Sequence, residues 1–265
     1  MNRKKKSGTK PLYRIGCTSY CFPDDILPNV KKVAPLVDDV EILLFESDNS
    51  LEFKNLEIID DLKQLTQNHN ITYTIHLPID TPVLFGCNAD NTRYLNQITE
   101  IIAKTKDLFP FAYILHLDGI GPNASRGELH DWRKSCVKLC SDISRIHNLD
   151  LEKICLENME YPLEWFLDFQ EMFGFSLCLD IGHLWMHEGN WEDVLIKCLP
   201  ATRVIHLHGV KNGKDHLSLK ESDFKNLFRL VSFIKKQFIG VVTLEIFSLN
   251  DMLESYDILK RIQRQ

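Results

Sequence analysis

Eight short apolar segments, each followed by a longer segment that can be helical, run the length of the chain. The predicted strands are residues 13–19, 39–46, 71–76, 112–117, 153–157, 176–180, 203–208 and 240–246. The predicted helices are residues 25–36, 56–68, 91–107, 128–148, 162–173, 190–198, 221–237 and 250–262. Alternating strands and helices favour an α/β fold with a parallel sheet, and eight such units favour closure into a single (β/α)₈ TIM barrel.

An open doubly wound sheet is the alternative arrangement of such units. That fold normally carries a glycine-rich, phosphate-binding turn after its first strand. Here the corresponding turn reads Thr18-Ser19-Tyr20-Cys21 and contains no glycine. The chain of 265 residues is long enough for one barrel and contains no internal linker or repeat. We therefore expect one catalytic domain over residues 11–265, preceded by a disordered basic tail over residues 1–10.

The charge balance bears on the partners of the protein. The formal net charge is −6, which provides no long-range attraction to nucleic acid or to anionic lipid. The basic N-terminal residues are not followed by the apolar run of a signal peptide, and no stretch reaches the ~18 apolar residues of a membrane span. We therefore expect a cytoplasmic protein with a small-molecule substrate, without a nucleic-acid or membrane partner, and with free thiols. The sequence does not predict the oligomeric state.

Acidic and histidine residues occur at the ends of six predicted strands. Because strand side chains alternate between two faces, parity predicts which of them point into the barrel. In the segment 176–180, Asp180 points inward when Leu177 and Leu179 face the helices. The same test turns six further residues inward, namely His76, His116, Glu157, His206, His208 and Glu245. These side chains would meet at the C-terminal rim, where barrel enzymes carry their active sites.

A single inward histidine is more often a hydrogen-bonded core residue than a metal ligand. The carboxylates are harder to explain in that way, because a buried charge is costly unless it is paired or bound to a metal. Glu157, Asp180 and Glu245 would share one rim, and histidines that are largely neutral at pH 7 cannot offset their charge. The whole set therefore favours a divalent metal site, and mixed imidazole and carboxylate ligands suit zinc, manganese or iron(II).

The strand-end motifs follow one another as Ile75-His76-Leu77-Pro78, Leu115-His116, Leu156-Glu157-Asn158, Leu179-Asp180-Ile181-Gly182-His183, Ile205-His206-Leu207-His208 and Leu244-Glu245. This series resembles the ligand motifs of the xylose-isomerase-like TIM barrels, a superfamily that holds AP endonucleases of the endonuclease IV type and sugar isomerases and epimerases. The resemblance implies two or three divalent ions. One ion would be shared by Glu157, Asp180, His206 and Glu245. A second would lie between His76, His116 and a bridging Glu157, and a third at His183 and His216.

The chain departs from the endonuclease-like pattern after the seventh strand. Those members carry an aspartate and a histidine two residues apart, whereas Asp215 and His216 are adjacent here. Adjacent strand residues point to opposite faces, so we do not expect both to reach one ion. His208 has the right parity to replace one of them.

A second set of motifs lies mainly near the N-terminus, and consists of Thr18-Ser19-Tyr20, Asp25-Ile26-Leu27-Pro28-Asn29-Val30, Ala34-Pro35, residues 37–46, His206-Leu207-His208-Gly209-Val210 and Lys214-Asp215-His216-Leu217. These motifs resemble the cobamide-remodelling phosphodiesterases, which belong to the same superfamily. The resemblance implies metal-dependent hydrolysis within the nucleotide loop of a cobamide (a corrinoid), with release of cobinamide phosphate and of the lower-ligand riboside, α-ribazole.

Roles for three carboxylates and two lysines complete this interpretation. Glu157 and Glu245 are the predicted catalytic carboxylates, and Glu46 is a candidate for orienting water or a ribose hydroxyl, although a solvated strand-end carboxylate explains it equally well. Lys211 and Lys214 are candidates for binding the phosphate or are plain surface lysines. A sugar isomerase or epimerase that uses one divalent metal is the competing enzyme, and a corrinoid-binding barrel without turnover is the non-catalytic alternative. DNA repair fits the ligands but not the acidic charge.

Overall fold

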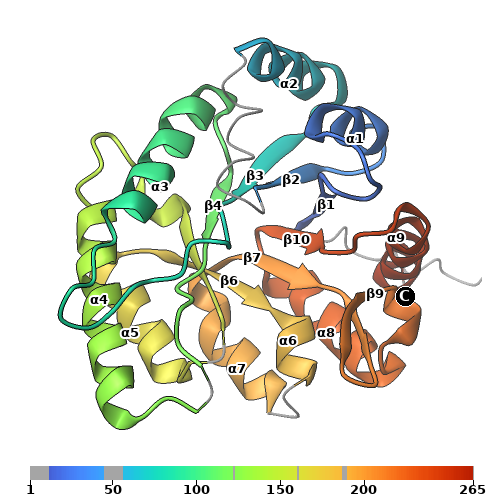
Figure 1. Cartoon of the computed structure of the whole chain (residues 1–265). Coiled ribbons are helices and arrows are strands. Elements are labelled where there is room, and N and C mark those ends of the chain that lie inside the picture. Colours follow the sequence, from blue (N-terminus) through green and yellow to red (C-terminus); the bar gives the residue numbers. More distant parts are fainter. Residues whose placement is uncertain (1–11, 45–55, 122, 160, 187–189, 265) are drawn as a thin grey trace, which may run out of the picture.

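Eight parallel strands form a closed barrel in the computed structural model, which describes residues 12–44, 56–121, 123–159, 161–186 and 190–264 (Figure 1). Around the barrel the strands follow the order β1-β10-β7-β6-β5-β4-β3-β2. Their bounds are β1 (Arg14–Thr18), β2 (Asp39–Leu43), β3 (Thr72–His76), β4 (Ala112–Leu115), β5 (Ile154–Glu157), β6 (Ser176–Asp180), β7 (Thr202–Leu207) and β10 (Val241–Leu244). The predicted (β/α)₈ barrel is confirmed.

Helices surround the barrel on its outer face (Figure 1). The α-helices are α1 (Ile26–Val33), α2 (Leu56–His69), α3 (Thr92–Thr105), α4 (Arg126–Ile143), α5 (Leu163–Phe173), α6 (Ile181–Met186), α7 (Trp191–Cys198), α8 (Phe224–Gln237) and α9 (Leu249–Gln263). Short 3₁₀ helices are η2 (Lys106–Leu108), η3 (Leu151–Lys153), η4 (Leu199–Ala201) and η5 (Leu219–Glu221). Among the described residues, no helix is both long and apolar enough to cross a lipid bilayer.

The helices begin and pack where the sequence provides caps and apolar stripes. Ser125 begins α4 with a reciprocal capping box, in which its hydroxyl accepts from the Glu128 amide and the Glu128 carboxylate accepts from the Ser125 amide. On α8 the buried residues recur with helical spacing, and they are Leu227, Leu230, Val231 and Ile234. Such stripes attach the helices to the outside of the barrel and leave its interior to the inward-facing strand residues.

The buried residues form two layers that follow strand parity. The larger cluster fills the space between strands and helices and includes Leu177 and Leu179. The smaller cluster lies inside the barrel and consists of Ala112, Ile114, Cys155, Cys178 and Val204, with Phe111 against it. Because side chains two residues apart share a face, Asp180 follows Cys178 to the inside. This is the orientation that the sequence predicts.

Three features differ from the predicted elements. An antiparallel hairpin of β8 (Gly209–Lys211) and β9 (Lys214–Leu217) follows β7, and the short helix α6 directly follows β6. Several predicted strands were too long at their C-terminal ends, since β4, β7 and β10 end before His116, His208 and Glu245. Residues 1–10, predicted to be a disordered tail, lie outside the described residues.

Candidate metal centre

Four of the predicted ligands meet at the C-terminal rim of the barrel. Glu157, Asp180, His206 and Glu245 each place one ligand atom within 4.8 Å of the others, and all four side chains are buried. They come from four different strands or strand ends, β5, β6, β7 and β10. Closure of the barrel, rather than proximity in sequence, therefore brings them together.

A second group shares Glu157 with the first. His76, His116 and Glu157 also place ligand atoms within 4.8 Å of one another. The Oε2 atom of Glu157 lies 2.9 Å from His116 Nε2, 3.6 Å from His76 Nε2 and 3.4 Å from His206 Nδ1. One carboxylate oxygen thus faces both groups, which is the position that a bridging ligand occupies.

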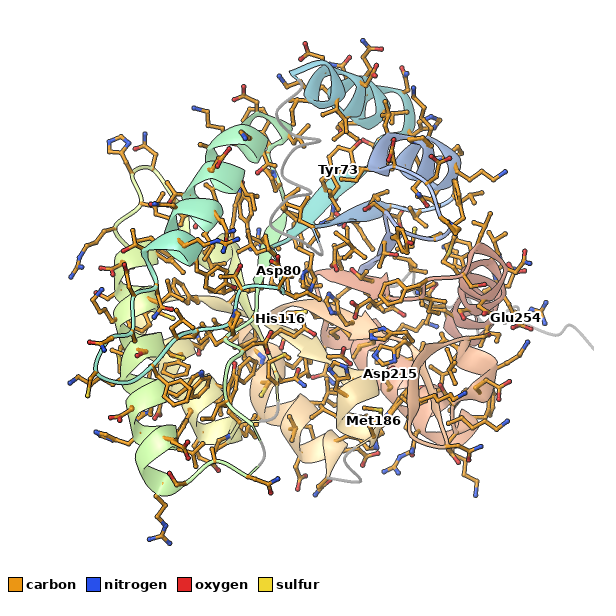
Figure 2. All side chains as sticks on the ribbon, viewed as in Figure 1. Tyr73, Asp80, His116, Met186, Asp215 and Glu254 are labelled. Atoms are coloured by element: carbon orange, nitrogen blue, oxygen red, sulfur yellow. The ribbon has the colours of Figure 1, made fainter. Side chains whose placement is uncertain are left out.

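A third group involves the hairpin. Asp215 Oδ2 lies 3.7 Å from His183 Nε2 and 3.8 Å from His216 Nε2. His216 has a left-handed backbone with a φ of 50°, which breaks the alternation of strand side chains. The structure therefore brings the adjacent residues Asp215 and His216 to one place, contrary to the expectation from their spacing. In Figure 2, Asp215 and His116 both lie near the middle of the molecule, inside the ring of helices.

Five histidines each place one ring nitrogen against an oxygen atom of the protein and turn the other towards these groups. Such partners orient the rings and favour one tautomer, as is usual for metal-binding histidines. His76 Nδ1 donates to the Leu77 carbonyl (2.9 Å), His116 Nδ1 to Asp118 (3.3 Å), His206 Nε2 to Glu41 (3.0 Å) and His216 Nδ1 to the Glu245 carbonyl (3.0 Å), while His183 Nδ1 lies 3.3 Å from Asp180 Oδ2. The other ring nitrogen of each histidine faces carboxylates or rings of these groups and could bind a metal once it is unprotonated, so the arrangement fits divalent metals.

His208 is arranged in the opposite way. The backbone amide of His216 donates to His208 Nδ1 (3.0 Å), so the ring carries its proton on Nε2, which lies 3.2 Å from Asp180 Oδ1. The ring packs against Gly182, where a Cβ would approach its atoms to 2.1–2.4 Å. His208 is therefore placed to orient Asp180 and the hairpin. It also offers a ring nitrogen within 4.8 Å of ligand atoms of His183 and His216, so its role as a replacement ligand stays a prediction.

Glu41 is a buried carboxylate of the site that the sequence analysis missed. It lies on β2 beneath the rim, accepts from His206 Nε2 and accepts from the Thr243 hydroxyl at 3.3 Å. Among the described residues, Glu41 Oε1 and His206 Nδ1 have no hydrogen-bond partner. His206 Nδ1 instead faces Glu245 Oε2 at 3.1 Å. The alternation of Val40 and Ile42 with Asp39 and Glu41 was the available signal, because it turns both acids inward.

The electrostatics of the cluster favour bound positive charge. Burial alone would raise the pKa of Glu157, but the charges of His206 and His116 hold the pKa well below its usual range. Burial lowers the pKa of His116, and the carboxylates of Glu157 and Asp118 outweigh it and raise the pKa to about 10. Burial raises the pKa of the nearby Cys178 thiol well above its usual value, which argues against a thiolate ligand.

Two of the predicted site residues, Lys211 and Lys214, lie elsewhere. Lys211 forms an ion pair with Glu221 on the exposed hairpin, and Lys214 is exposed at the start of β9. Neither lysine belongs to the metal-type groups or lines the cavity beside them. Glu46 lies outside the described residues.

A cavity of about 740 Å³ opens beside the metal-type groups. It shares Asp118, His183 and Asp215 with their surroundings, and its other lining residues are Ile120, Asn158, Met159, Tyr161, Leu163, Phe166, Leu184, Met186 and Val194. The volume is within the usual range of small-molecule sites, about 300–1,000 Å³.

Comparison with known proteins identifies the class to which this fold and site belong. The family model of the xylose isomerase-like TIM barrel matches residues 37–262, and the chain therefore belongs to that family. The predicted superfamily is confirmed. A search of the curated proteins found no match to this sequence.

Solved structures of the same fold have different activities in their names. A D-tagatose 3-epimerase-like protein is 21% identical, with a TM-score of 0.76 and coverage of 94% of this chain and 96% of that chain. The 3-keto-D-glucoside 4-epimerase of E. coli is 16% identical, with a TM-score of 0.66 and coverage of 96% and 100%. Endonuclease IV of Thermus thermophilus is 12% identical, with a TM-score of 0.68 and coverage of 94% and 98%. At these identities the likeness shows the fold alone.

Proposed function

We propose that the chain is a metal-dependent phosphodiesterase that hydrolyses the nucleotide loop of cobamides and releases cobinamide phosphate and α-ribazole. The observation that supports hydrolysis is that Glu157 belongs to two groups of candidate metal ligands. Paired metals about 3.5–4 Å apart are a recurring device for displacement at phosphorus, whereas one ion does not require His76 and His116. The substrate class rests on the motifs at residues 18–46, 206–210 and 214–217 that resemble cobamide-remodelling enzymes.

In this proposal the side chains of the barrel hold and orient the reacting groups. Divalent ions bound by the two groups would neutralise the phosphodiester oxygens and lower the pKa of a water molecule. Glu41 keeps the proton of His206 on Nε2, and Asp118 keeps that of His116 on Nδ1. Glu245 Oε2 lies 3.1 Å from His206 Nδ1 and 3.8 Å from His216 Nδ1, between the first and third groups. We assign Glu245 to accept the proton of the attacking water.

Sugar epimerisation with one divalent metal is the second candidate. It is favoured by the group of Glu157, Asp180, His206 and Glu245, which is sufficient to hold one ion by itself. Epimerases among the solved structures of this fold also favour it. In that reaction Glu157 or Glu245 would stand near the position of the base. A corrinoid-binding barrel without turnover is the non-catalytic candidate.

Product analysis separates these candidates. Anaerobically purified protein is supplied with zinc, manganese or iron(II), incubated with adenosylcobalamin, and followed by mass spectrometry. The phosphodiesterase predicts cobinamide phosphate and α-ribazole. An intact corrinoid that co-elutes with the protein would instead favour the binding barrel. In a parallel incubation with a ketose such as D-tagatose, conversion to an epimer resolved by chromatography would favour the epimerase.

Two variants assign the second group. His76 belongs to the group with His116 and lies outside the four-residue group, so His76→Ala should abolish hydrolysis and lower the metal content measured by elemental analysis. Asp180→Ala should abolish activity in either enzyme. His130→Ala, at an exposed position on α4, is the matched control and should retain both. Full hydrolysis by His76→Ala would show that the group of His76 and His116 is not needed for the reaction, and would favour an enzyme that uses one metal.

A further inference from the structure

The lining of the cavity beside the metal-type groups combines ionisable side chains with a larger number of apolar ones. Asp118, His183 and Asp215 border it where it meets the histidine and carboxylate groups. The rest of the lining, here called the apolar side, is formed mainly by Ile120, Met159, Leu163, Phe166, Leu184, Met186 and Val194. Figure 2 places Met186, at the end of α6, near Asp215 of β9. A molecule in this cavity would therefore meet both cation-binding groups and an apolar surface.

The two remaining polar side chains of the lining are already engaged within the protein. Asn158 Oδ1 accepts from the Asp180 amide at 2.6 Å, and its Nδ2 donates to the Asp180 carbonyl at 3.2 Å. Tyr161 donates its hydroxyl to the Glu157 carbonyl at 3.1 Å. These hydrogen bonds hold β5 and β6 at the rim and leave each group only part of its hydrogen-bonding capacity for a ligand.

This distribution selects against a polyhydroxylated ligand on the apolar side. A sugar hydroxyl placed there would lose its hydrogen bonds to water without replacement, which is costly. A flat aromatic ring would instead bury apolar surface, and the sulfur atoms of Met159 and Met186 make favourable contacts with aromatic rings.

We propose that the apolar side of this cavity binds the bicyclic aromatic base of the substrate, a benzimidazole-type ring, while the phosphodiester lies against the groups that share Glu157. This inference rests on the proposed phosphodiesterase function and deepens it. The ribose would span the two sides, next to Asp118, His183 and Asp215. The cavity then accounts for recognition of the lower ligand, and the metal-type groups account for the reaction.

Binding of fragments tests the base site without turnover. Calorimetric titration of the full chain with 5,6-dimethylbenzimidazole and with α-ribazole should give measurable binding. Titration with uracil, a polar base, and with ribose should give affinities at least ten-fold weaker. Met186→Gln should weaken binding of α-ribazole about ten-fold, because it replaces a thioether that lines the cavity with an amide. Met172→Gln makes the same substitution at an exposed position on α5 and should leave binding unchanged.

Hydrolysis of simple phosphodiesters separates a failure of this inference from a failure of the function. Methyl p-nitrophenyl phosphate and 2-naphthyl p-nitrophenyl phosphate share a leaving group and differ in the second ester. A KM at least ten-fold lower for the naphthyl ester, lost in Met186→Gln with kcat retained, supports the base site. Hydrolysis of both esters with equal KM and no binding of the benzimidazole overturns the base site and leaves the phosphodiesterase standing. Binding of the benzimidazole with no hydrolysis of any diester supports the base site and overturns the function.

Discussion

Replacing Glu41 with glutamine should weaken metal binding without altering the fold. Glu41 and His206 are both fully buried, and their Oε2 and Nε2 atoms are 3.0 Å apart. Glutamine has nearly the same shape and can still accept from Nε2, but it removes the negative charge that makes the imidazole a better ligand. Loss of such an outer partner costs about 10–100-fold in metal affinity, which is about 1.4–2.8 kcal/mol of binding free energy. Glu41→Ala removes the acceptor as well and should cost more.

The measurement is competition between the protein and a chromogenic chelator for zinc or manganese. Asp39→Asn is the matched control, because Asp39 is also a buried inward carboxylate on β2. Asp39 accepts from the Thr72 hydroxyl and makes no hydrogen bond to His206 among the described contacts. We expect Asp39→Asn to change metal affinity by less than two-fold. Wild-type affinity in Glu41→Gln, or an equal loss in both variants, would refute the orienting role of Glu41.

Three further predictions concern pH and packing. Burial raises the pKa of Asp39 to about 7, above its unfolded value, so the folded state keeps the proton to a higher pH. The free energy of unfolding should therefore fall as pH rises from about 4 to 7, by at most about 1.4 kcal/mol per pH unit. Urea unfolding of Asp39→Asn should show a flatter dependence of this free energy on pH. Burial lowers the pKa of His116, but Glu157 outweighs it and raises the pKa to about 10, so the contribution of His116 to metal-free stability should be complete below about pH 6.5 and lost as pH approaches 10. Divalent metals should bind more tightly as pH rises over the same range, because a ligand must lose its proton. Denaturation after chelation and metal titration at each pH check the two expectations, and a metal affinity that is flat from about pH 6.5 to 9 would contradict His116 as a metal ligand. Gly182→Ala should destabilise the protein by about 1–3 kcal/mol and displace His208, because the new Cβ would lie 2.1–2.4 Å from atoms of that ring. Gly127→Ala on α4 is the control and should not destabilise the protein, because the nearest atom to its Cβ would be 3.9 Å away. Equal stability of the two variants in urea would show that His208 has room to move.

Much of the rim could be predicted because it depends on two regularities. Strand parity turns Asp180 inward whenever Leu177 and Leu179 pack under helices, and barrel closure then brings the ends of parallel strands to one rim. Glu157 and His206 follow the same rule from β5 and β7. These residues needed no knowledge of loops, and the structure brings them together.

Other parts of the site depend on features without a period in the sequence. The hairpin turns His216 towards Asp215 through a left-handed backbone, which alternation cannot predict. Helix α6 has six residues, too few to show a helical repeat, although it carries His183. Glu41 could not be found from strand ends, because it lies within β2 and its partner His206 is 165 residues away in sequence. The role of His208 depends on which atom reaches each ring nitrogen, and this becomes visible only in three dimensions.

The charge inside the rim bears on the number of ions. Four fully or nearly fully buried carboxylates line it, and they are Glu41, Glu157, Asp180 and Glu245. If the histidines are neutral, as ligands must be, these groups carry four negative charges in a region from which water is largely excluded. One divalent ion would balance half of that charge, whereas two would balance it fully. The same carboxylates that one ion can use for epimerisation are therefore more readily accommodated with two ions, and it is the second pair of histidines, His76 and His116, that gives a second ion its nitrogen ligands.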